Sequence, residues 1–262
     1  MRAWPAHSML SVTTTGRGPD LVMLHGWGLN SSVWSAMLPA LESRWRVTCI
    51  DLPGHGGSSA RIDLRDLDAV CTALNLAAPP PRAVWLGWSM GGLIATTHAL
   101  RYPDRVSRLI LVASQPRFAR AADWPHGMAS KLLDDFAASL ERQPTDTLAR
   151  FLALQVHRSE HPASTLRSLR AAMSLYAPDR DSVNAGLSLL QAADLRAELP
   201  LLSCPLRLIL GERDVLVRAT AGPAVAALVK SARHRVIGGA GHAPFLSHVS
   251  EFNNVLEEFL DD

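Results

Sequence analysis

Residues 83–92, with the sequence AVWLGWSMGG, carry the strongest indication of the fold class. The first six are an unbroken apolar run, which is typical of a strand buried on both faces of a sheet. A helical pattern covers residues 90–101, so the chain turns sharply from strand to helix at Ser89. Gly87 and Gly91 leave room for such a turn because neither carries a Cβ. A strand, a tight turn and a helix in this order predict an α/β fold with a serine at the turn.

Similar apolar runs recur along the chain and alternate with helical patterns. The expected strands cover residues 21–25, 46–51, 83–88, 108–113, 206–210 and 233–237. The expected helices cover residues 33–41, 64–76, 90–101, 219–229 and 249–260. Continuous apolar strands that alternate with helices predict a mostly parallel, doubly wound sheet. Residues 9–14 are expected to add an antiparallel edge strand.

The interval between residues 113 and 206 breaks this alternation. It contains no convincing strand pattern, and residues 124–195 show the spacing of apolar residues that is typical of helices. Prolines divide this stretch into four short helices, at Pro125, Pro144, Pro162 and Pro178. We therefore expect residues 115–195 to form a helical cap insertion. The α/β core would then consist of residues 1–114 and 196–262, and the insertion would wall a ligand cleft.

Ser89 is the candidate nucleophile. At the start of a helix its hydroxyl is exposed, and the backbone N–H of Met90 is available to a developing oxyanion. The alternative is a glycine-rich helix start in which the serine has no catalytic role. A serine hydroxyl is a weak nucleophile at neutral pH, so it requires a base and an acid that orients the base.

The expected chain order is serine, acid, histidine. Asp214 lies in the loop after the strand of residues 206–210, and it is the candidate acid. Glu212 is the rival carboxylate, but it lies two residues nearer the strand and is expected to face elsewhere. His242 follows the glycine-rich residues 238–241 and is the candidate base, because glycines allow this loop to reach the serine.

Residues 25–28, with the sequence HGWG, follow the first parallel strand. The N–H of Trp27 is the candidate second oxyanion donor, and its indole is expected to line the cleft, with a position in the core as the alternative. His25 is expected to hold the loop by hydrogen bonds. Asp51 and His55 belong to a turn at the same edge and are given no catalytic role.

The composition limits the partners and the cofactors. There are 26 basic and 24 acidic residues, a net charge of +2, which gives no reason to expect nucleic-acid binding. No run of 18 apolar residues is present, so no membrane span is expected. The three cysteines are odd in number and widely spaced, which argues against a disulfide framework or a zinc site. We expect a cytoplasmic monomer without metal or organic cofactor.

Five motifs occur in the order HGWG, DLPGHGxS, GWSMGG, GxxD and GHAPF, and with them nearly the whole chain resembles the α/β-hydrolase superfamily. Within that superfamily, four stretches are similar to the pimeloyl-[acyl-carrier protein] methyl ester esterases of biotin synthesis. These are residues 25–30, 85–89, 151–155 and 243–248. The resemblance implies hydrolysis of a methyl ester at the far end of a carrier-bound pimeloyl chain, with release of methanol.

The resemblance also implies a substrate site. Trp27, Ser89, Met90 and His242 would hold the ester group. The acyl channel would be lined by Phe151, Leu152, Ala153, Leu154 and Gln155.

An acidic carrier protein requires a basic docking surface. Residues 142–180 contain six arginines and three acidic residues, a local excess of +3. The candidate docking residues are Arg142, Arg150, Arg158, Arg167 and Arg170. The alternative is an ordinary solvated helical face.

Three functions therefore compete. The first is the carrier-linked methyl esterase. The second is a general short-chain carboxylesterase or a carbon–carbon bond hydrolase with the same three residues. The third is a non-catalytic binding protein of the hydrolase fold, although such proteins usually lack one of the three.

Overall fold

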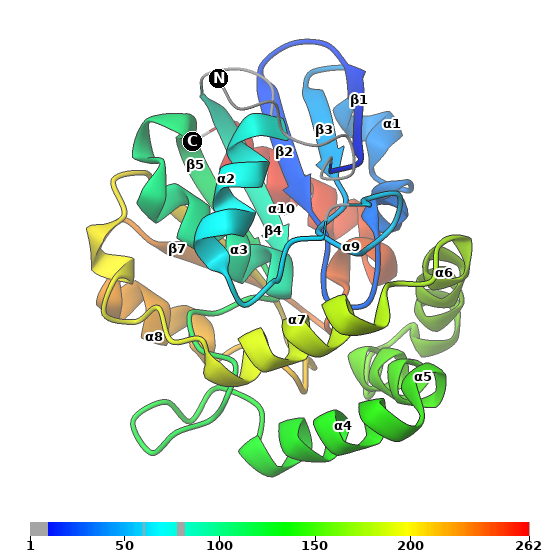
Figure 1. Cartoon of the computed structure of the whole chain (residues 1–262). Helices are drawn as coiled ribbons and strands as arrows, with labels where there is room; N and C mark the ends of the chain where they lie inside the picture. Colours follow the sequence, from blue (N-terminus) through cyan, green and yellow to red (C-terminus); the bar gives the residue numbers. More distant parts are fainter. Residues whose placement is uncertain (1–9, 60, 78–81, 262) are drawn as a thin grey trace.

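A computed structural model of the chain describes residues 10–59, 61–77 and 82–261. Within these residues seven strands form one sheet in the order β1-β3-β2-β4-β5-β6-β7 (Figure 1). The strands are β1 (Val12–Gly16), β2 (Asp20–Leu24), β3 (Arg46–Ile50), β4 (Ala83–Trp88), β5 (Val106–Val112), β6 (Leu206–Gly211) and β7 (Arg233–Ile237). All neighbouring strands are parallel except β1 and β3, so the predicted mostly parallel sheet is confirmed.

The edge strand β1 pairs antiparallel with β3, as predicted, but it begins at Val12. Met9, at the start of the expected strand, lies outside the described residues. The expected strands 83–88 and 233–237 coincide with β4 and β7, and the others differ only at their ends.

Helices cover both faces of the sheet. The α-helices of this layer are α1 (Leu38–Leu41), α2 (Leu67–Ala77), α3 (Met90–Arg101), α8 (Ala221–Leu228), α9 (Pro244–Ser247) and α10 (Val249–Asp261). The 3₁₀-helices are η1 (Ser31–Trp34), η2 (Pro103–Arg105) and η3 (Leu199–Leu201). Alternate strand residues belong to two apolar clusters: Val22 belongs to the cluster that includes side chains of α2, α3 and α8, and Met23 to the cluster that includes side chains of α1 and α10. Strands buried on both faces explain the continuous apolar runs.

The prediction of one helix over residues 33–41 is wrong. The chain forms η1, a short break and then α1. Pro39 explains the break, because it has no N–H to donate to an earlier carbonyl and its ring disfavours a helix that runs through it. Asn30 begins η1 by accepting a hydrogen bond from the N–H of Ser32 at 3.1 Å.

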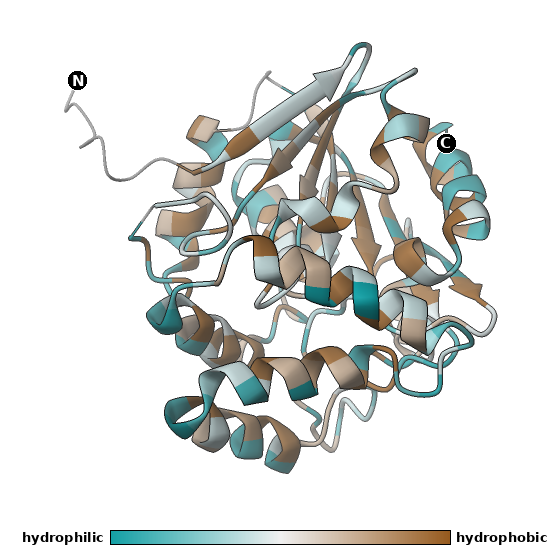
Figure 2. Ribbon diagram, turned by 90° about the vertical axis from the view of Figure 1, so that its right-hand side faces the viewer, coloured by the Kyte–Doolittle hydropathy of each residue, from teal (hydrophilic) through white to brown (hydrophobic). Residues whose placement is uncertain are grey.

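Four helices lie beyond the carboxyl ends of the strands (Figure 1). They are α4 (Ser130–Arg142), α5 (Pro144–Gln155), α6 (Pro162–Leu175) and α7 (Arg180–Ala192). Pro144 and Pro162 occupy the first turns of α5 and α6, where the missing N–H costs nothing. Figure 2 shows that hydrophobic and hydrophilic residues alternate along these helices, as expected for helices with one buried face. The sequence did not predict the two β-bridges that fold residues 119–128 back on themselves.

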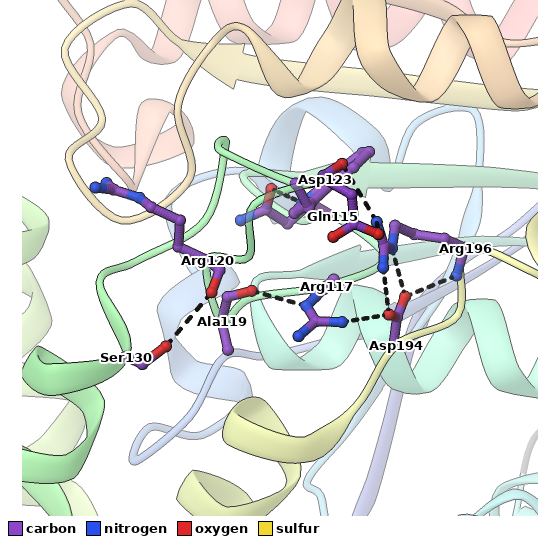
Figure 3. Close-up of polar contacts among 9 residues, drawn as sticks. Gln115, Arg117, Ala119, Arg120, Asp123, Ser130, Asp194 and Arg196 are labelled. Carbon is purple, nitrogen blue, oxygen red and sulfur yellow. Dashed lines mark hydrogen bonds and ion pairs between the residues drawn. The ribbon is translucent and has the colours of Figure 1, made fainter.

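Ion pairs join the two segments that connect these four helices to the sheet (Figure 3). Arg117, which precedes α4, donates to Asp194, which follows α7, at 2.5 Å. Arg196 donates to Asp194 at 2.7 Å and pairs with Asp123 at 2.9 Å. Hydrogen bonds from Arg196 and Arg117 hold the pKa of the Asp194 carboxyl well below its usual range. The segment that leads into the four helices and the segment that follows them are thus held together.

None of the helices among the described residues combines the length and the apolar composition that a bilayer crossing requires.

Candidate active site

Ser89 lies at the turn between β4 and α3 and has a left-handed φ of 55°. Non-glycine residues rarely adopt this conformation, and the packing around the turn must stabilise it. A Cβ at Gly87 would lie 2.4 Å from the carbonyl oxygen of Gly91. A Cβ at Gly91 would lie 2.4 Å from the carbonyl oxygen of His25. Both glycines are therefore required sterically, and they bring the start of α3 close to the loop after β2.

Three buried side chains meet beside this turn. The hydroxyl of Ser89 lies 2.9 Å from Nε2 of His242, and Nδ1 of His242 lies 2.8 Å from Oδ2 of Asp214. The three residues are 153 positions apart at most, and all come from loops at the carboxyl ends of β4, β6 and β7. The Asp214 carboxylate accepts from Nδ1–H, so Nε2 presents its lone pair to the serine O–H. This is the arrangement in which an imidazole can remove the serine proton.

Backbone donors fix the Asp214 carboxylate. Its Oδ1 accepts the N–H groups of Leu216 at 2.8 Å and Val217 at 3.0 Å, which leaves Oδ2 for the imidazole. Glu212 instead accepts the N–H of Gly239 at 2.9 Å, and its side chain is 58% exposed. Glu212 therefore supports the loop that carries His242 and makes no contact with the imidazole.

Two further contacts hold His242 through its backbone. Its N–H donates to the carbonyl oxygen of Gln155 at 2.9 Å, at the end of α5. Its carbonyl oxygen accepts the indole N–H of Trp88 at 2.8 Å. The Ser114 hydroxyl, in turn, donates to the carbonyl oxygen of Ser89 at 2.8 Å. Sequence reasoning did not find these supports, because each depends on a backbone atom and carries no motif.

The N–H groups of Trp27 and Met90 have no hydrogen-bond partner among the described residues. Met90 is the first residue of α3, where a backbone N–H has no partner within the helix. Such free donors are suited to an oxyanion.

The Trp27 indole is buried, and its N–H donates to the carbonyl oxygen of Val183 in α7 at 2.8 Å. The indole therefore packs in the core, contacting Phe151 edge-on at 4.7 Å, and its polar atom is already bound.

Two histidines hold the loop that contains Trp27. Nε2 of His25 accepts the N–H of Leu52 at 2.9 Å, and Nε2 of His55 accepts the N–H of Gly28 at 3.3 Å. Burial lowers the pKa of His25, and burial together with the neighbouring His25 lowers the pKa of His55 to about 4. Both rings are consequently neutral near pH 7 and act as hydrogen-bond acceptors in the loop.

Comparison with known proteins agrees with this geometry. Residues 19–249 match the family model of the alpha/beta hydrolase fold. The chain belongs to the α/β-hydrolase family. It is 41% identical over 252 residues to the pimeloyl-[acyl-carrier protein] methyl ester esterase of Xanthomonas oryzae pv. oryzae (strain MAFF 311018), covering 96% of this chain and 98% of that protein. It is 43% identical over 244 residues to the enzyme of the same name from Nitrosomonas europaea, covering 93% and 96%. The predicted resemblance is confirmed.

A solved structure gives the same fold. An esterase from Exiguobacterium antarcticum superposes on this hydrolase with a TM-score of 0.88 at 23% identity, covering 97% of this chain and 96% of the other. At this identity the likeness concerns the fold alone.

A narrow apolar pocket with a cavity volume of about 10 Å³ lies at the Ser89 side chain of this hydrolase. The inserted helices α4, α5 and α7 supply much of its wall, and so do the segment before α4 and the loop after β6. Besides Ser89 and His242, it is lined by Phe118, Met128, Leu133, Phe136, Phe151, Leu187, Leu190 and Leu216. The two catalytic candidates are the polar residues of a lining that is otherwise apolar.

Within the expected channel segment, Phe151 is the residue that lines this pocket. Leu152 packs in the other apolar cluster, which includes Trp88. Ala153 is exposed and Leu154 is half-buried. Gln155 is buried and contributes its carbonyl oxygen to the His242 loop. The structure therefore does not bring the whole segment to the pocket.

The five candidate docking arginines are all exposed on α4, α5, α6 and the turn before α6. They are Arg142, Arg150, Arg158, Arg167 and Arg170. The guanidinium of Arg150 lies over the ring of Phe136, 5.8 Å from its centroid, so part of that side chain also covers the pocket wall.

Proposed function

We propose that this chain is a serine carboxylesterase that hydrolyses the methyl ester of pimeloyl-[acyl-carrier protein] to the free carboxylate and methanol. The observation that carries the proposal is the continuous chain of hydrogen bonds from Asp214 through His242 to Ser89, which opens on an apolar pocket. Relatives at 40–43% identity over nearly the whole chain are named for this reaction.

In the first step Ser89 attacks the ester carbonyl while Nε2 of His242 takes the hydroxyl proton. Asp214 keeps the proton of Nδ1 in place and stabilises the imidazolium that forms. The N–H groups of Trp27 and Met90 stabilise the negative charge on the carbonyl oxygen. The carbon–oxygen bond to the methoxy group then breaks, and methanol leaves with the proton from His242.

In the second step water repeats the sequence on the acyl-enzyme. His242 takes a proton from water, the hydroxide attacks the acyl carbon, and the bond to Ser89 breaks as the serine regains its proton. The product is the carboxylic acid, which loses its proton to water and leaves as the carboxylate. Atoms and protons balance in both steps without a metal or an organic cofactor, so the proposal includes neither.

The lining of the pocket supports an acyl substrate. Its walls are apolar side chains, and burial of methylene groups against such walls is favourable by roughly 0.8 kcal/mol for each CH₂. The free carboxylate of the product interacts poorly with these walls, which favours its release. We expect the uncharged methyl ester to be the form that binds against these walls once the narrow pocket widens.

The proposal includes the carrier protein as partner, with the exposed arginines of residues 142–170 as its docking surface. Arginine forks suit carboxylates and the phosphate of a carrier's prosthetic arm. The charge balance gives no support for a nucleic-acid partner. We also infer a cytoplasmic monomer: the three cysteines are buried thiols, and exposed large apolar side chains are scattered along the described residues.

Two measurements test the proposal. Ser89→Ala should remove labelling by a fluorophosphonate and lower the turnover of the carrier-bound methyl ester by about 10⁴-fold or more, with unchanged circular dichroism. The unmodified enzyme should hydrolyse the carrier-bound methyl ester with a higher kcat/KM than free short-chain esters. Equal or better use of the free esters would favour the general carboxylesterase, and a Ser89 that is never labelled would favour a binding protein.

A further inference from the structure

A second group of ligand-type side chains lies away from Ser89. Glu160 and His161 belong to the turn between α5 and α6, and His248 lies between α9 and α10. One potential ligand atom from each residue lies within 4.8 Å of the others. We propose that these three residues bind a divalent transition-metal ion, with Zn²⁺ as the preferred ion, and that this ion joins the inserted helices to the core.

The hydrogen bonds of His248 indicate which ring nitrogen is free. Its Nδ1 lies 2.8 Å from the hydroxyl of Ser247, and that hydroxyl donates its own proton to the carbonyl oxygen of Ala243 at 3.3 Å. The hydroxyl therefore accepts from His248, so Nδ1 carries the proton. In the neutral ring Nε2 then has a lone pair, which is the form that binds metals.

This lone pair faces a carboxylate. Nε2 of His248 is buried, has no hydrogen-bond partner among the described residues, and lies 3.6 Å from Oε2 of Glu160. A lone pair and a carboxylate oxygen repel each other unless a cation lies between them. The cation is either a proton on Nε2 or a metal ion.

The surroundings of Glu160 leave one carboxylate oxygen available to a metal ion. Arg213 donates to Oε1 at 3.2 Å, so the carboxylate is already paired with a cation and Oε2 remains for a second ligand interaction. The backbone N–H of Glu160 donates to the carbonyl oxygen of Gly239 at 3.0 Å, which fixes the turn against the core. Supporting contacts of this kind orient metal ligands.

His161 completes the ligand set. Its side chain is exposed, and its ring centroid lies 5.3 Å from that of His248. Two imidazoles, one carboxylate and one water form a tetrahedral set that suits Zn²⁺, with bonds of about 2.0–2.2 Å and hence about 3.4 Å between ligand atoms. The exposed side chains of Glu160 and His161 can rotate inward to close the remaining gap.

The position of the site defines its role. Helix α6 packs against α9 (Figure 1), so an ion held by these residues would cross from the insertion to the core. The ion would take no part in the reaction at Ser89. Because it binds the folded chain and not the unfolded chain, it would raise the free energy of unfolding. This proposal departs from the expectation, drawn from the cysteine pattern, of a chain without any metal.

The test uses the full chain, stripped with a chelator and then titrated with Zn²⁺ by calorimetry. One ion should bind per chain, and Co²⁺ in its place should give the visible absorption of a tetrahedral site. His161→Ala and Glu160→Gln should each weaken Zn²⁺ binding by about 100-fold or more, above the 10–100-fold that loss of a supporting contact costs. Both residues are exposed, so both variants should fold, which circular dichroism checks.

His157→Ala is the matched control, because His157 is an exposed histidine in the turn after α5, four residues before His161. This control should bind Zn²⁺ as the unmodified chain does. His242→Gln should also retain binding, which separates the site from the imidazole beside Ser89. Absence of stoichiometric binding, equal affinity in His161→Ala, or loss of binding in His242→Gln alone would overturn the proposal and leave His248 as the protonated partner of Glu160.

Discussion

Replacement of Asp214 by asparagine tests how the acid orients the imidazole. Asparagine has one oxygen and one NH₂ group where aspartate has two oxygens. Either the oxygen faces the N–H groups of Leu216 and Val217, or it faces Nδ1 of His242. The two orientations have opposite effects on Ser89, because they set opposite tautomers of the imidazole.

The structure decides between these orientations. If NH₂ faced the backbone, two buried N–H donors would lose their acceptor, at about 1–3 kcal/mol each and so about 2–6 kcal/mol together. The oxygen should therefore face the backbone with a preference of at least about 30-fold, at 1.36 kcal/mol for each factor of ten. The NH₂ group then donates to Nδ1 of His242, and the ring proton moves to Nε2. In this tautomer the imidazole has no lone pair for the Ser89 hydroxyl.

The expected result for Asp214→Asn is a loss of about 10⁴-fold in kcat/KM, or about 5.4 kcal/mol of transition-state stabilisation. The free energy of unfolding should change little, because both backbone hydrogen bonds remain. Ester hydrolysis and thermal unfolding measure the two quantities. Glu212→Gln is the control and should retain activity within about twofold, because the side chain is exposed and a glutamine amide oxygen can still accept the N–H of Gly239. Activity of Asp214→Asn within tenfold of the unmodified enzyme, or an equal loss in the control, would refute the reasoning.

Three further predictions concern packing, the pocket and the ion pairs. Gly91→Ala should lower the free energy of unfolding by about 1–3 kcal/mol or more in denaturant titrations, whereas Gly238→Ala, where an added Cβ would lie in open space, should not. Leu187→Trp should hinder widening of the narrow pocket and reduce kcat/KM about tenfold or more for long acyl esters but less for acetyl esters, and an equal reduction for both would contradict this. The carboxyl pKa of Asp194 is lower in the folded chain, so its stabilisation is present above about pH 4 and is lost as the pH falls further. Asp194→Asn should therefore flatten the acid limb of a thermal-unfolding profile against pH, whereas Asp135→Asn, in an exposed pair, should leave that limb unchanged.

The fold was predictable because its signal is local and repeated. Each central strand is apolar on both faces, and the Ser89 turn requires two glycines at fixed positions. The short break at Pro39 could also have been predicted, since a proline inside an apparent helix is a known stop signal. The three candidate catalytic side chains were found from motifs in the loops after strands. In a parallel sheet the carboxyl ends of the strands lie at the same edge, so these loops lie close together.

The pocket lining was less predictable, for a reason that lies in helix geometry. Successive residues of an α-helix are rotated by about 100°, so a run of five cannot face one channel. Phe151 lines the pocket, and the next residue, Leu152, packs in the other apolar cluster. Most of the remaining lining comes from α4, α7 and the bridged segment before α4, whose positions over Ser89 depend on tertiary contacts.

The inserted helices differ in how they are connected to the loops that carry His242 and Trp27, and this difference limits how a substrate can enter. Movement of α5 would break the bond between Gln155 and the backbone of His242, and movement of α7 would break the bond between Val183 and the indole of Trp27. Helix α4 packs against α5 and α7 and supplies Leu133 and Phe136 to the pocket. Displacement of α4 would therefore widen the pocket while the hydrogen bonds at His242 and Trp27 stay intact. Entry of an acyl chain past α4 is the route that preserves the hydrogen bonds at His242 and Trp27.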